Sequence, residues 1–138
     1  MDHNFIIKSI RNEVITDTEL YTKIESRFFP HVINLGGDDI VYPFISFVFS
    51  GGVPDKDKYP HKTVLLEFYF VSNSSMDQAY SLYNRFIKVI NNKRFMSEDK
   101  TFNFCVYEDS LCIDSTTLVN GRLTYIASNT MVARTIAK

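Results

Sequence analysis

The residues that most suggest chemistry are the paired aspartates of Gly37-Asp38-Asp39. Paired aspartates on a tight turn hold two metal ions in palm polymerases, and similar glycine-aspartate turns serve nucleotide cyclases. Such a site also needs a third carboxylate on a neighbouring strand, and here the turn continues into Ile40-Val41 rather than into acidic and aromatic residues. We therefore interpret this segment as a glycine-rich turn and expect no metal, no cofactor and no enzymatic activity.

The three histidines give no sign of a common site. His3, His31 and His61 are far apart, and none has a second histidine or a cysteine at the spacing of a metal site. His61 follows Pro60 at the end of a polar segment, which is typical of a solvated turn histidine.

The two cysteines allow two interpretations. If Glu108-Asp109 formed a two-residue turn, Cys105 and Cys112 would lie directly opposite each other on adjacent strands, close enough for a disulfide. Synthesis in the cytosol instead favours two free thiols that pack as small apolar side chains. Neither cysteine has a histidine nearby in the sequence that would activate it as a nucleophile.

Cations gather where the main helix is expected to end. Lys88, Lys93 and Arg94 fall in or just after its last turn, where cations stabilise the exposed carbonyl groups. Capping is our interpretation, and a contact with a small anion or a partner is the alternative. The aromatic residues are interleaved with few basic ones, so a stacking platform for single-stranded nucleic acid lacks its electrostatic half.

Composition narrows the class of protein. The 138 residues are 45% hydrophobic, with 12 Phe, 8 Tyr and a net charge of −1. This composition predicts one globular domain, residues 1–138, rather than a disordered chain, and the near-neutral charge disfavours broad electrostatic binding of nucleic acid. No apolar run approaches the roughly 18 residues of a membrane span. The first residues lack the pattern of a signal peptide, so we expect synthesis and use in the cytosol or in a particle assembled there.

Residues 62–92 predict the centre of the fold, a strand over 63–71 that passes through 72–75 into an amphipathic helix. The strand directs alternate residues to opposite faces, with Leu66, Phe68 and Phe70 on one of them. The helix carries an apolar stripe at spacings of three and four. Its members are Met76, Ala79, Tyr80, Tyr83, Phe86, Ile87 and Ile90. We expect an α+β fold, a mainly antiparallel sheet with one long helix and short N-terminal helices packed on it.

The remaining segments predict further elements around this unit. A helix of about ten residues should begin near Phe5, and a shorter one should follow, capped by Thr16 or Asp17. Strands are expected at 28–33, irregular or at an edge because of Pro30, and at 44–49, ended by Gly51-Gly52 with Pro54. Three more are expected at 102–107, 111–118 and 122–132, with Asn120-Gly121 as a tight turn between the last two.

The strands at 44–49 and 64–71 are apolar on both faces, and only one long helix is available to cover them. Either the N-terminal helices cover the second face or another subunit does, so we infer a homo-oligomer. Residues 53–61 form a polar loop between two strands. We expect Asp55, Lys56, Asp57 and Lys58 in this loop to be an exposed contact element.

The order of these elements resembles tail terminator, or tail completion, proteins of long-tailed bacteriophages. The resemblance covers nearly the whole chain and rests on an N-terminal helix, a short acidic helix start at Asp17, a strand closing on Pro30, the proline-led strand Tyr42-Pro43-Phe44-Ile45-Ser46-Phe47, the long strand with its serine-rich entry to a helix, and a terminal strand. It implies a ring, typically a hexamer, that caps the last ring of the tail tube and presents the surface to which the head connector docks. The implied partners are other copies of the chain, the tail tube protein and a head connector or stopper protein. Genomic DNA would pass through the lumen, and no membrane would be involved. The resemblance brings no catalytic residues. It places the protein at the head-proximal end of the tail in the virion, assembled in the host cytoplasm.

Three alternatives remain open at this point. The chain could be another component of the phage head–tail connector. It could also be a small-ligand-binding regulatory domain of similar α+β layout, or a metal-dependent enzyme that uses Asp38 and Asp39.

Overall fold

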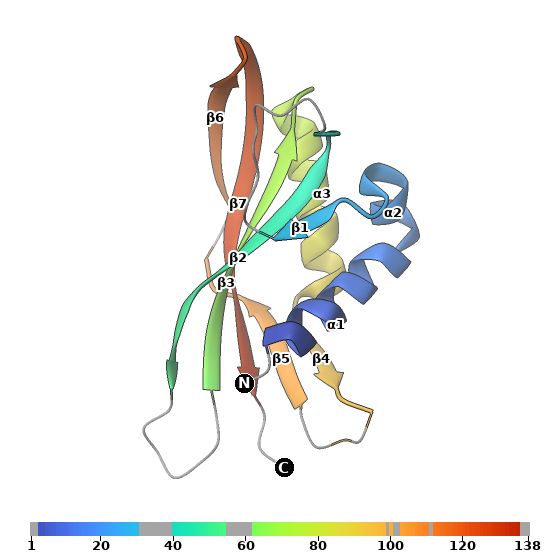
Figure 1. The fold of residues 1–138 in the computed structure, drawn as a ribbon, viewed down its shortest axis with the longest axis vertical. Coiled ribbons are helices and arrows are strands. Elements are labelled where there is room, and N and C mark those ends of the chain that lie inside the picture. Colours follow the sequence, from blue (N-terminus) through green and yellow to red (C-terminus); the bar gives the residue numbers. More distant parts are fainter. Residues whose placement is uncertain are drawn as a thin grey trace.

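The expected α+β fold is confirmed in a computed structural model that describes residues 3–30, 40–54, 62–98, 100, 103–110 and 112–135. Within these residues three helices pack on a curled, mostly antiparallel sheet of seven strands (Figure 1). The elements in chain order are α1 (His3–Thr16), α2 (Thr18–Ile24), β1 (Phe28–Pro30), β2 (Phe44–Pro54), β3 (Lys62–Ser72), α3 (Met76–Ile90), β4 (Lys93–Met96), β5 (Asn103–Glu108), β6 (Ile113–Val119) and β7 (Arg122–Thr135). No helix in the described part of the chain is long and apolar enough to cross a membrane.

The long strand β7 organises the sheet. The strand order is β1-β2-β3-β7-β5-β4, and only β1 and β2 run parallel. One edge of β7 pairs with β3. The other edge is shared, because β6 pairs with residues 122–128 of β7 and β5 pairs with residues 131–135. β5 and β6 are therefore successive partners of the same strand.

The predicted strand-to-helix unit is confirmed. The Ser75 side chain caps α3 by accepting a hydrogen bond from the backbone N–H of Gln78. The Ser72 hydroxyl accepts hydrogen bonds from the backbone N–H groups of Ser74 and Ser75 and donates one to the Gln78 side chain. These bonds satisfy the polar groups of the short loop, so the strand passes directly into the helix.

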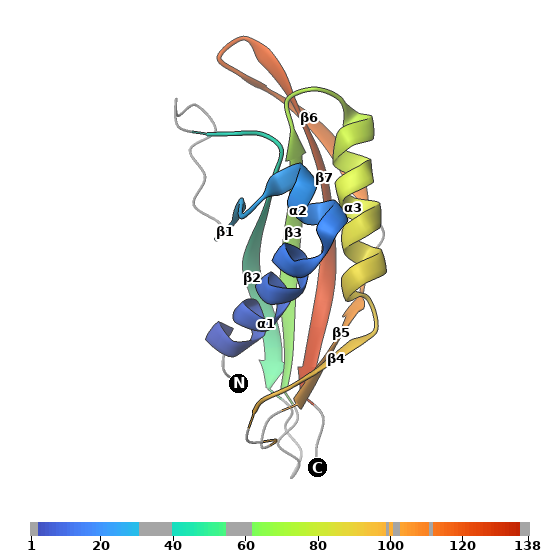
Figure 2. The same cartoon turned by 90° about the vertical axis from the view of Figure 1, so that its right-hand side faces the viewer.

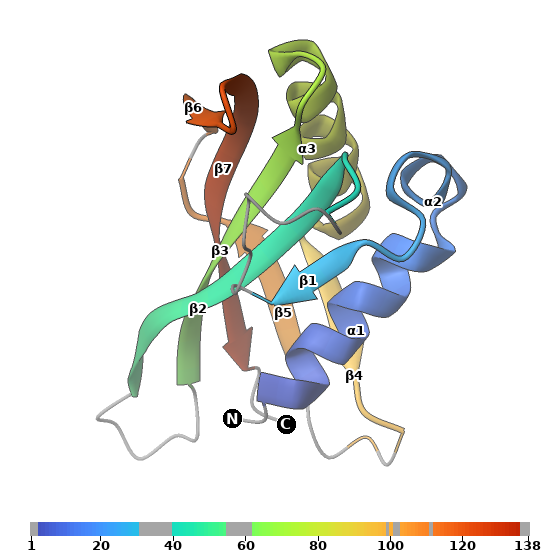
Figure 3. The ribbon, with the colours of Figure 1, turned by 45° about the horizontal axis from the view of Figure 1, so that its top comes forward.

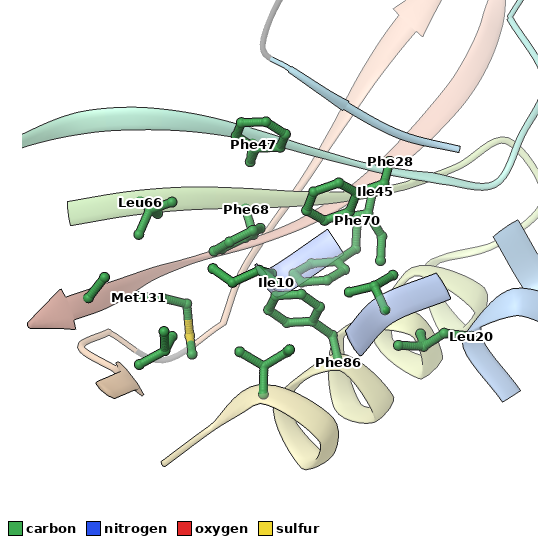
Figure 4. Packing of buried hydrophobic residues seen from close by; sticks show 14 of the residues in the cluster. Ile10, Leu20, Phe28, Ile45, Phe47, Leu66, Phe68, Phe70, Phe86 and Met131 are labelled. Atoms are coloured by element: carbon green, nitrogen blue, oxygen red, sulfur yellow. The ribbon is translucent and has the colours of Figure 1, made fainter. Parts of the chain in front are cut away.

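The core forms where α3 crosses β3 and its neighbours. Phe86 is fully buried, with its ring centroid 4.7 Å from that of Phe68 and 5.2 Å from that of Phe70 (Figure 4). Of the predicted stripe, Ala79, Phe86 and Ile90 are buried, and its other members pack partly buried against the core. Leu82, which the stripe did not include, is also fully buried.

The N-terminal helices lie on the same face of the sheet as α3 (Figure 2). α1 is 14 residues long, longer than expected, and buries Ile6, Ile10 and Val14 in the common core. α2 begins at its predicted cap, since the Asp17 carboxylate accepts a hydrogen bond from the Leu20 N–H. The N-terminal helices therefore do not cover the second face.

β2 is longer than expected, and one strand was not expected at all. Gly51-Gly52 lies inside β2, which continues to Pro54 with a register shift between Phe49 and Gly51. Gly51 adopts φ of +124°, a backbone conformation that suits glycine. It forms a β-bulge, and the strand continues past the bulge instead of ending there. The segment after α3 forms the unpredicted strand β4, because Phe95 packs on Phe104 of β5.

The tight turn at Asn120-Gly121 is confirmed. Both residues have positive φ, +52° and +78°, as a two-residue hairpin turn of type I′ requires. β6 and β7 pair in register from Val119–Arg122 back to Ile113–Ser128. The pairing of β3 with β7 stops at Ser72–Tyr125, so the tip of this hairpin extends past the end of β3.

Candidate interaction surfaces

Several of the predicted site residues lie outside the described residues. They are Asp38 and Asp39 of the proposed turn, His31, His61, and Asp55, Lys56, Asp57 and Lys58 of the predicted contact loop. In the described ranges no group of three or more His, Cys, Asp or Glu side chains is arranged to hold a metal ion. His3 lies at the start of α1, where its ring packs edge-on against Phe49 with centroids 4.4 Å apart.

The opposition of Cys105 and Cys112, which required a turn at Glu108-Asp109, does not form, and the interpretation as two free thiols is confirmed. Glu108-Asp109 forms no turn, because the chain continues along β7. The backbone N–H groups of Asp109 and Ser110 both donate to the carbonyl of Thr130, at 2.9 and 3.3 Å. Both cysteines are free thiols, and burial raises the pKa of Cys112. A raised pKa lowers the thiolate fraction, so Cys112 is a poor nucleophile at neutral pH.

A polar cluster fastens α3 to β5 and β7. Glu108 is its centre. Its carboxylate accepts hydrogen bonds from the Tyr83 hydroxyl and, at 3.0 Å, from the Asn129 side chain. The Glu108 N–H donates to the side-chain oxygen of Asn91 at 2.8 Å. Burial, followed by the hydrogen bond to Glu108, raises the pKa of Tyr83. Since the carboxylate is occupied by structural donors, we assign the cluster a positioning role.

A second tyrosine–carboxylate pair lies beside this cluster. The Tyr80 hydroxyl on α3 donates to Asp114 of β6, and this hydrogen bond raises the pKa of Tyr80 to about 12. Tyr80 therefore stays neutral through the physiological range and remains a hydrogen-bond donor. No sequence pattern pairs residue 80 with 114 or 83 with 108, because these contacts depend on which half of β7 each strand joins.

The cations near the end of α3 have different roles. Lys88 lies in the last turn, as predicted. Lys93 and Arg94 are in β4 instead, and Lys93 forms an ion pair with Glu13 of α1, with its Nζ 2.6 Å from the carboxylate oxygen. That contact ties β4 to the N-terminal helix, so capping of α3 was the wrong interpretation for Lys93.

A polar groove of about 510 Å³ lies between α2 and α3. Arg85 forms ion pairs on its wall with Asp17 at 2.6 Å and Glu19 at 2.9 Å. Lys23 donates to the Ser81 hydroxyl at 2.6 Å. Of the five charged residues that line the groove, Glu19 and Arg85 are paired with each other, whereas Lys23 is bonded to the neutral hydroxyl of Ser81.

The sheet face opposite the helices carries apolar side chains without a helix over it. The register places Leu65, Tyr69, Tyr107 and Ile126 on this face, all four only partly buried, together with Val71 and Val132, which are buried. Ile113 of β6, which the ladder places opposite Ser128 of this face, is 64% exposed. Glu67, which lies on the same face, accepts a hydrogen bond from the Tyr69 hydroxyl at 2.6 Å. We call this surface the open sheet face.

The β6–β7 hairpin is the other exposed feature. Leu118 and Leu123 are opposite each other in the ladder, 70% and 48% exposed. Four of the seven residues of β6 in succession, 113–116, are exposed. In Figure 3 the hairpin stands at one margin of the molecule.

In comparisons with known proteins, no family model and no curated protein matches the chain.

Proposed function

We propose that this chain is a structural virion protein, a ring-forming tail terminator that caps the tail tube of a long-tailed phage and provides the surface for head docking. The observation that carries the proposal is the open sheet face. All three described helices pack on the opposite side, and a sheet normally buries an apolar face against another layer. A second copy of the chain can supply that layer.

The mechanism would be mechanical. A head-to-tail contact that buries the open sheet face of each subunit against its neighbour closes into a ring if the rotation between copies permits. Partner rings above and below would then bind through several identical contacts at once. Such multivalent contacts give tight joining without a deep pocket in any one subunit. DNA would pass through the lumen of the assembled ring, and the protein would be found at the head-proximal end of the tail.

The direct experiment is to purify the protein and measure its native mass while imaging it by negative stain. We expect a closed ring of about six subunits with an open lumen. The matched variant is Tyr69→Lys, which places a charge on the open sheet face and should shift the mass to monomer while the melting temperature falls little. A wild-type monomer at all concentrations, or a ring unchanged in the variant, would contradict the proposal.

The segment between β2 and β3, residues 55–61, is proposed as a contact with a partner ring; the first two residues of the loop predicted at 53–61 belong to β2. Deleting Asp55 to Lys58 should leave a folded protein that no longer supports the joining of heads and tails. The control replaces the same four residues by Ser-Gly-Ser-Gly, which keeps the loop length and removes the charges. Normal yields of infectious particles from the deletion would count against this role.

A small-ligand-binding domain is the second candidate, favoured by the groove between α2 and α3. A ligand there would raise the melting temperature by mass action, and Arg85→Gln would abolish that rise. Screening the purified protein against small anions and metabolites distinguishes this candidate, because the ring proposal expects no such rise.

A further inference from the structure

The edge of β6 differs from the other free edges of the described sheet. Edge strands usually carry lysine, proline or a bulge that prevents unwanted pairing. β1 ends at Pro30, and β4 carries Lys93 and Arg94. Beyond its pairing with β1, β2 contains the bulge at Gly51 and ends at Pro54. β6, with the sequence Ile-Asp-Ser-Thr-Thr-Leu-Val, has no lysine, proline or bulge, and its one charged side chain, Asp114, is held by Tyr80 on the helix side of the sheet.

The pairing of β6 with β7 determines which backbone groups point away from the sheet. In a two-residue hairpin the pair that flanks the turn, here Val119 and Arg122, is hydrogen-bonded, and bonded pairs then alternate along the ladder. The N–H and C=O groups of residues 113, 115 and 117 therefore face β7. Those of Asp114, Thr116 and Leu118 face outward. The same alternation continues along β7. Thr130, two residues beyond Ser128, directs its carbonyl to this same edge, where it accepts hydrogen bonds from the N–H groups of Asp109 and Ser110.

No described element lies beyond this edge, and β6 is at the margin of the molecule in Figures 1 and 3. The Asp114 side chain is held by Tyr80 on the helix side of the sheet, which leaves its backbone groups accessible. β6 is also rich in β-branched residues, which favour strand pairing. The edge is therefore ready to accept an additional strand.

The sequence of β6 suits a second copy of itself. Antiparallel pairing centred on Thr116 would join all three outward-facing residues of each copy, Thr116 with Thr116 and Asp114 with Leu118. The two Asp114 carboxylates would then be four residues apart along the strand, about 14 Å, which exceeds the screening length of about 8 Å in physiological salt. Moving the centre to residue 114 would place the two aspartates directly opposite each other, which is unfavourable.

We propose that β6 is a strand-addition site and that its occupant is β6 of a second copy, paired antiparallel about Thr116. The contact would form roughly six backbone hydrogen bonds and would continue the sheet across a two-fold axis. Two short edges bury less than the roughly 1,000 Å² of a stable interface, so the pairing is weak and depends on concentration. It does not rest on the proposed ring, because it uses the backbone of one edge rather than the open sheet face.

Directed disulfide formation tests the register. Both native cysteines are first replaced by serine (Cys105→Ser, Cys112→Ser), and Ser115→Cys and Thr117→Cys are made separately in this background. In the proposed register residue 115 of one copy faces residue 117 of the other in a non-hydrogen-bonded pair, with Cα atoms about 4.5 Å apart, which suits a disulfide. Residue 115 is diagonal to its own counterpart, at about 7–8 Å, which is too far.

We expect a 1:1 mixture of the two variants to give a disulfide-linked dimer on mild oxidation, and each variant alone to give only background. Adding Thr116→Pro to both removes an outward N–H without loss from the β6–β7 ladder, and should reduce the linked dimer to background. Thr116→Val, which keeps that N–H, is the matched control. A mixture that forms no more dimer than the separate variants would overturn the proposal, as would a proline variant that links as well as its control. If the protein formed a ring but the mixed variants formed no disulfide-linked dimer, the strand addition would be refuted and the proposed ring would stand.

Discussion

Phe86→Ala is the sharpest test of how the core is built. Phe86 is fully buried, and its ring packs on Phe68 and Phe70 at centroid separations of 4.7 and 5.2 Å. Removing a buried phenylalanine ring costs the transfer free energy of its atoms and leaves a cavity, in total about 3–5 kcal/mol. The two lost aromatic contacts move the expected value to the upper part of that range.

This loss is large for a protein of this size. Domains are typically stable by about 5–15 kcal/mol, so the variant should retain between none and two-thirds of its stability. For a chain of 138 residues the melting temperature should fall by roughly 10–20 °C. Urea unfolding followed by circular dichroism would measure the free energy directly, with an unchanged dependence on urea showing that the unfolded state is the same.

Phe29→Ala is the matched control, since it deletes the same ring from the edge strand β1, where Phe29 is 39% exposed. We expect about 1 kcal/mol there, because less apolar area is lost from the folded protein. Equal losses for the two variants would refute the assignment of Phe86 to the centre of the core. A stable Phe86→Ala monomer that fails to assemble would show instead that the helix stripe is an interface.

Three further predictions concern charges and protons. Asp17→Ala removes both the cap of α2 and the ion pairs with Arg85, so unfolding by urea should show a loss of about 1–3 kcal/mol, with Arg85→Gln losing less. The hydrogen bond from Arg85 lowers the pKa of Asp17 in the folded state. The contribution of Asp17 to the free energy of unfolding should therefore be complete above the unfolded pKa of about 4 and be lost as the pH falls through the lower pKa of the folded state. Asp17→Ala should not show this pH dependence. Burial and the hydrogen bond to Glu67 raise the pKa of Tyr69 to about 12. The contribution of Tyr69 to stability should therefore be present below pH 10 and be lost as the pH rises through 12. A titration of tyrosinate absorbance in wild type and Tyr69→Phe would detect the raised pKa. Replacing Asp38 and Asp39 together by Asn should change stability by no more than about 0.5 kcal/mol, and a magnesium- or manganese-dependent rise in the wild-type melting temperature that vanishes in this variant would contradict the turn interpretation.

Local patterns predicted the elements well because each depends on residues close in sequence. The cap at Asp17, the entry to α3 and the turn at Asn120-Gly121 are all decided within four residues. The face of the sheet on which the helices lie was harder to predict from the sequence. Periodicity shows that α1 and α3 each have an apolar stripe, but the face of the sheet that each stripe covers is decided by packing between distant segments.

The pairing of strands was the least predictable part. Alternation along 103–108 and 113–119 is consistent with two strands of a hairpin or with two successive partners of a third strand. The choice depends on residues 109–112, which contain no glycine or proline to form a tight turn. The groove between α2 and α3 was missed for a related reason, since its ion pair between Asp17 and Arg85 joins positions 68 residues apart.

The break between β5 and β6 explains several features of this surface together. Between the pairs Glu108–Met131 and Ile113–Ser128 the chain advances five positions on one side and three on β7, so two residues are extra. Extra residues bend a strand and increase its twist, which redirects β6 relative to β5.

Tyr83 and Asn129 supply hydrogen bonds to Glu108 at this break, and Tyr80 holds Asp114 just beyond it. These contacts secure the redirected strand from the helix side, and the Ser128 hydroxyl on the other face donates to the Ile113 carbonyl at 3.4 Å. None of these contacts involves the outward-facing backbone groups of Thr116 and Leu118, which the proposed strand addition would use.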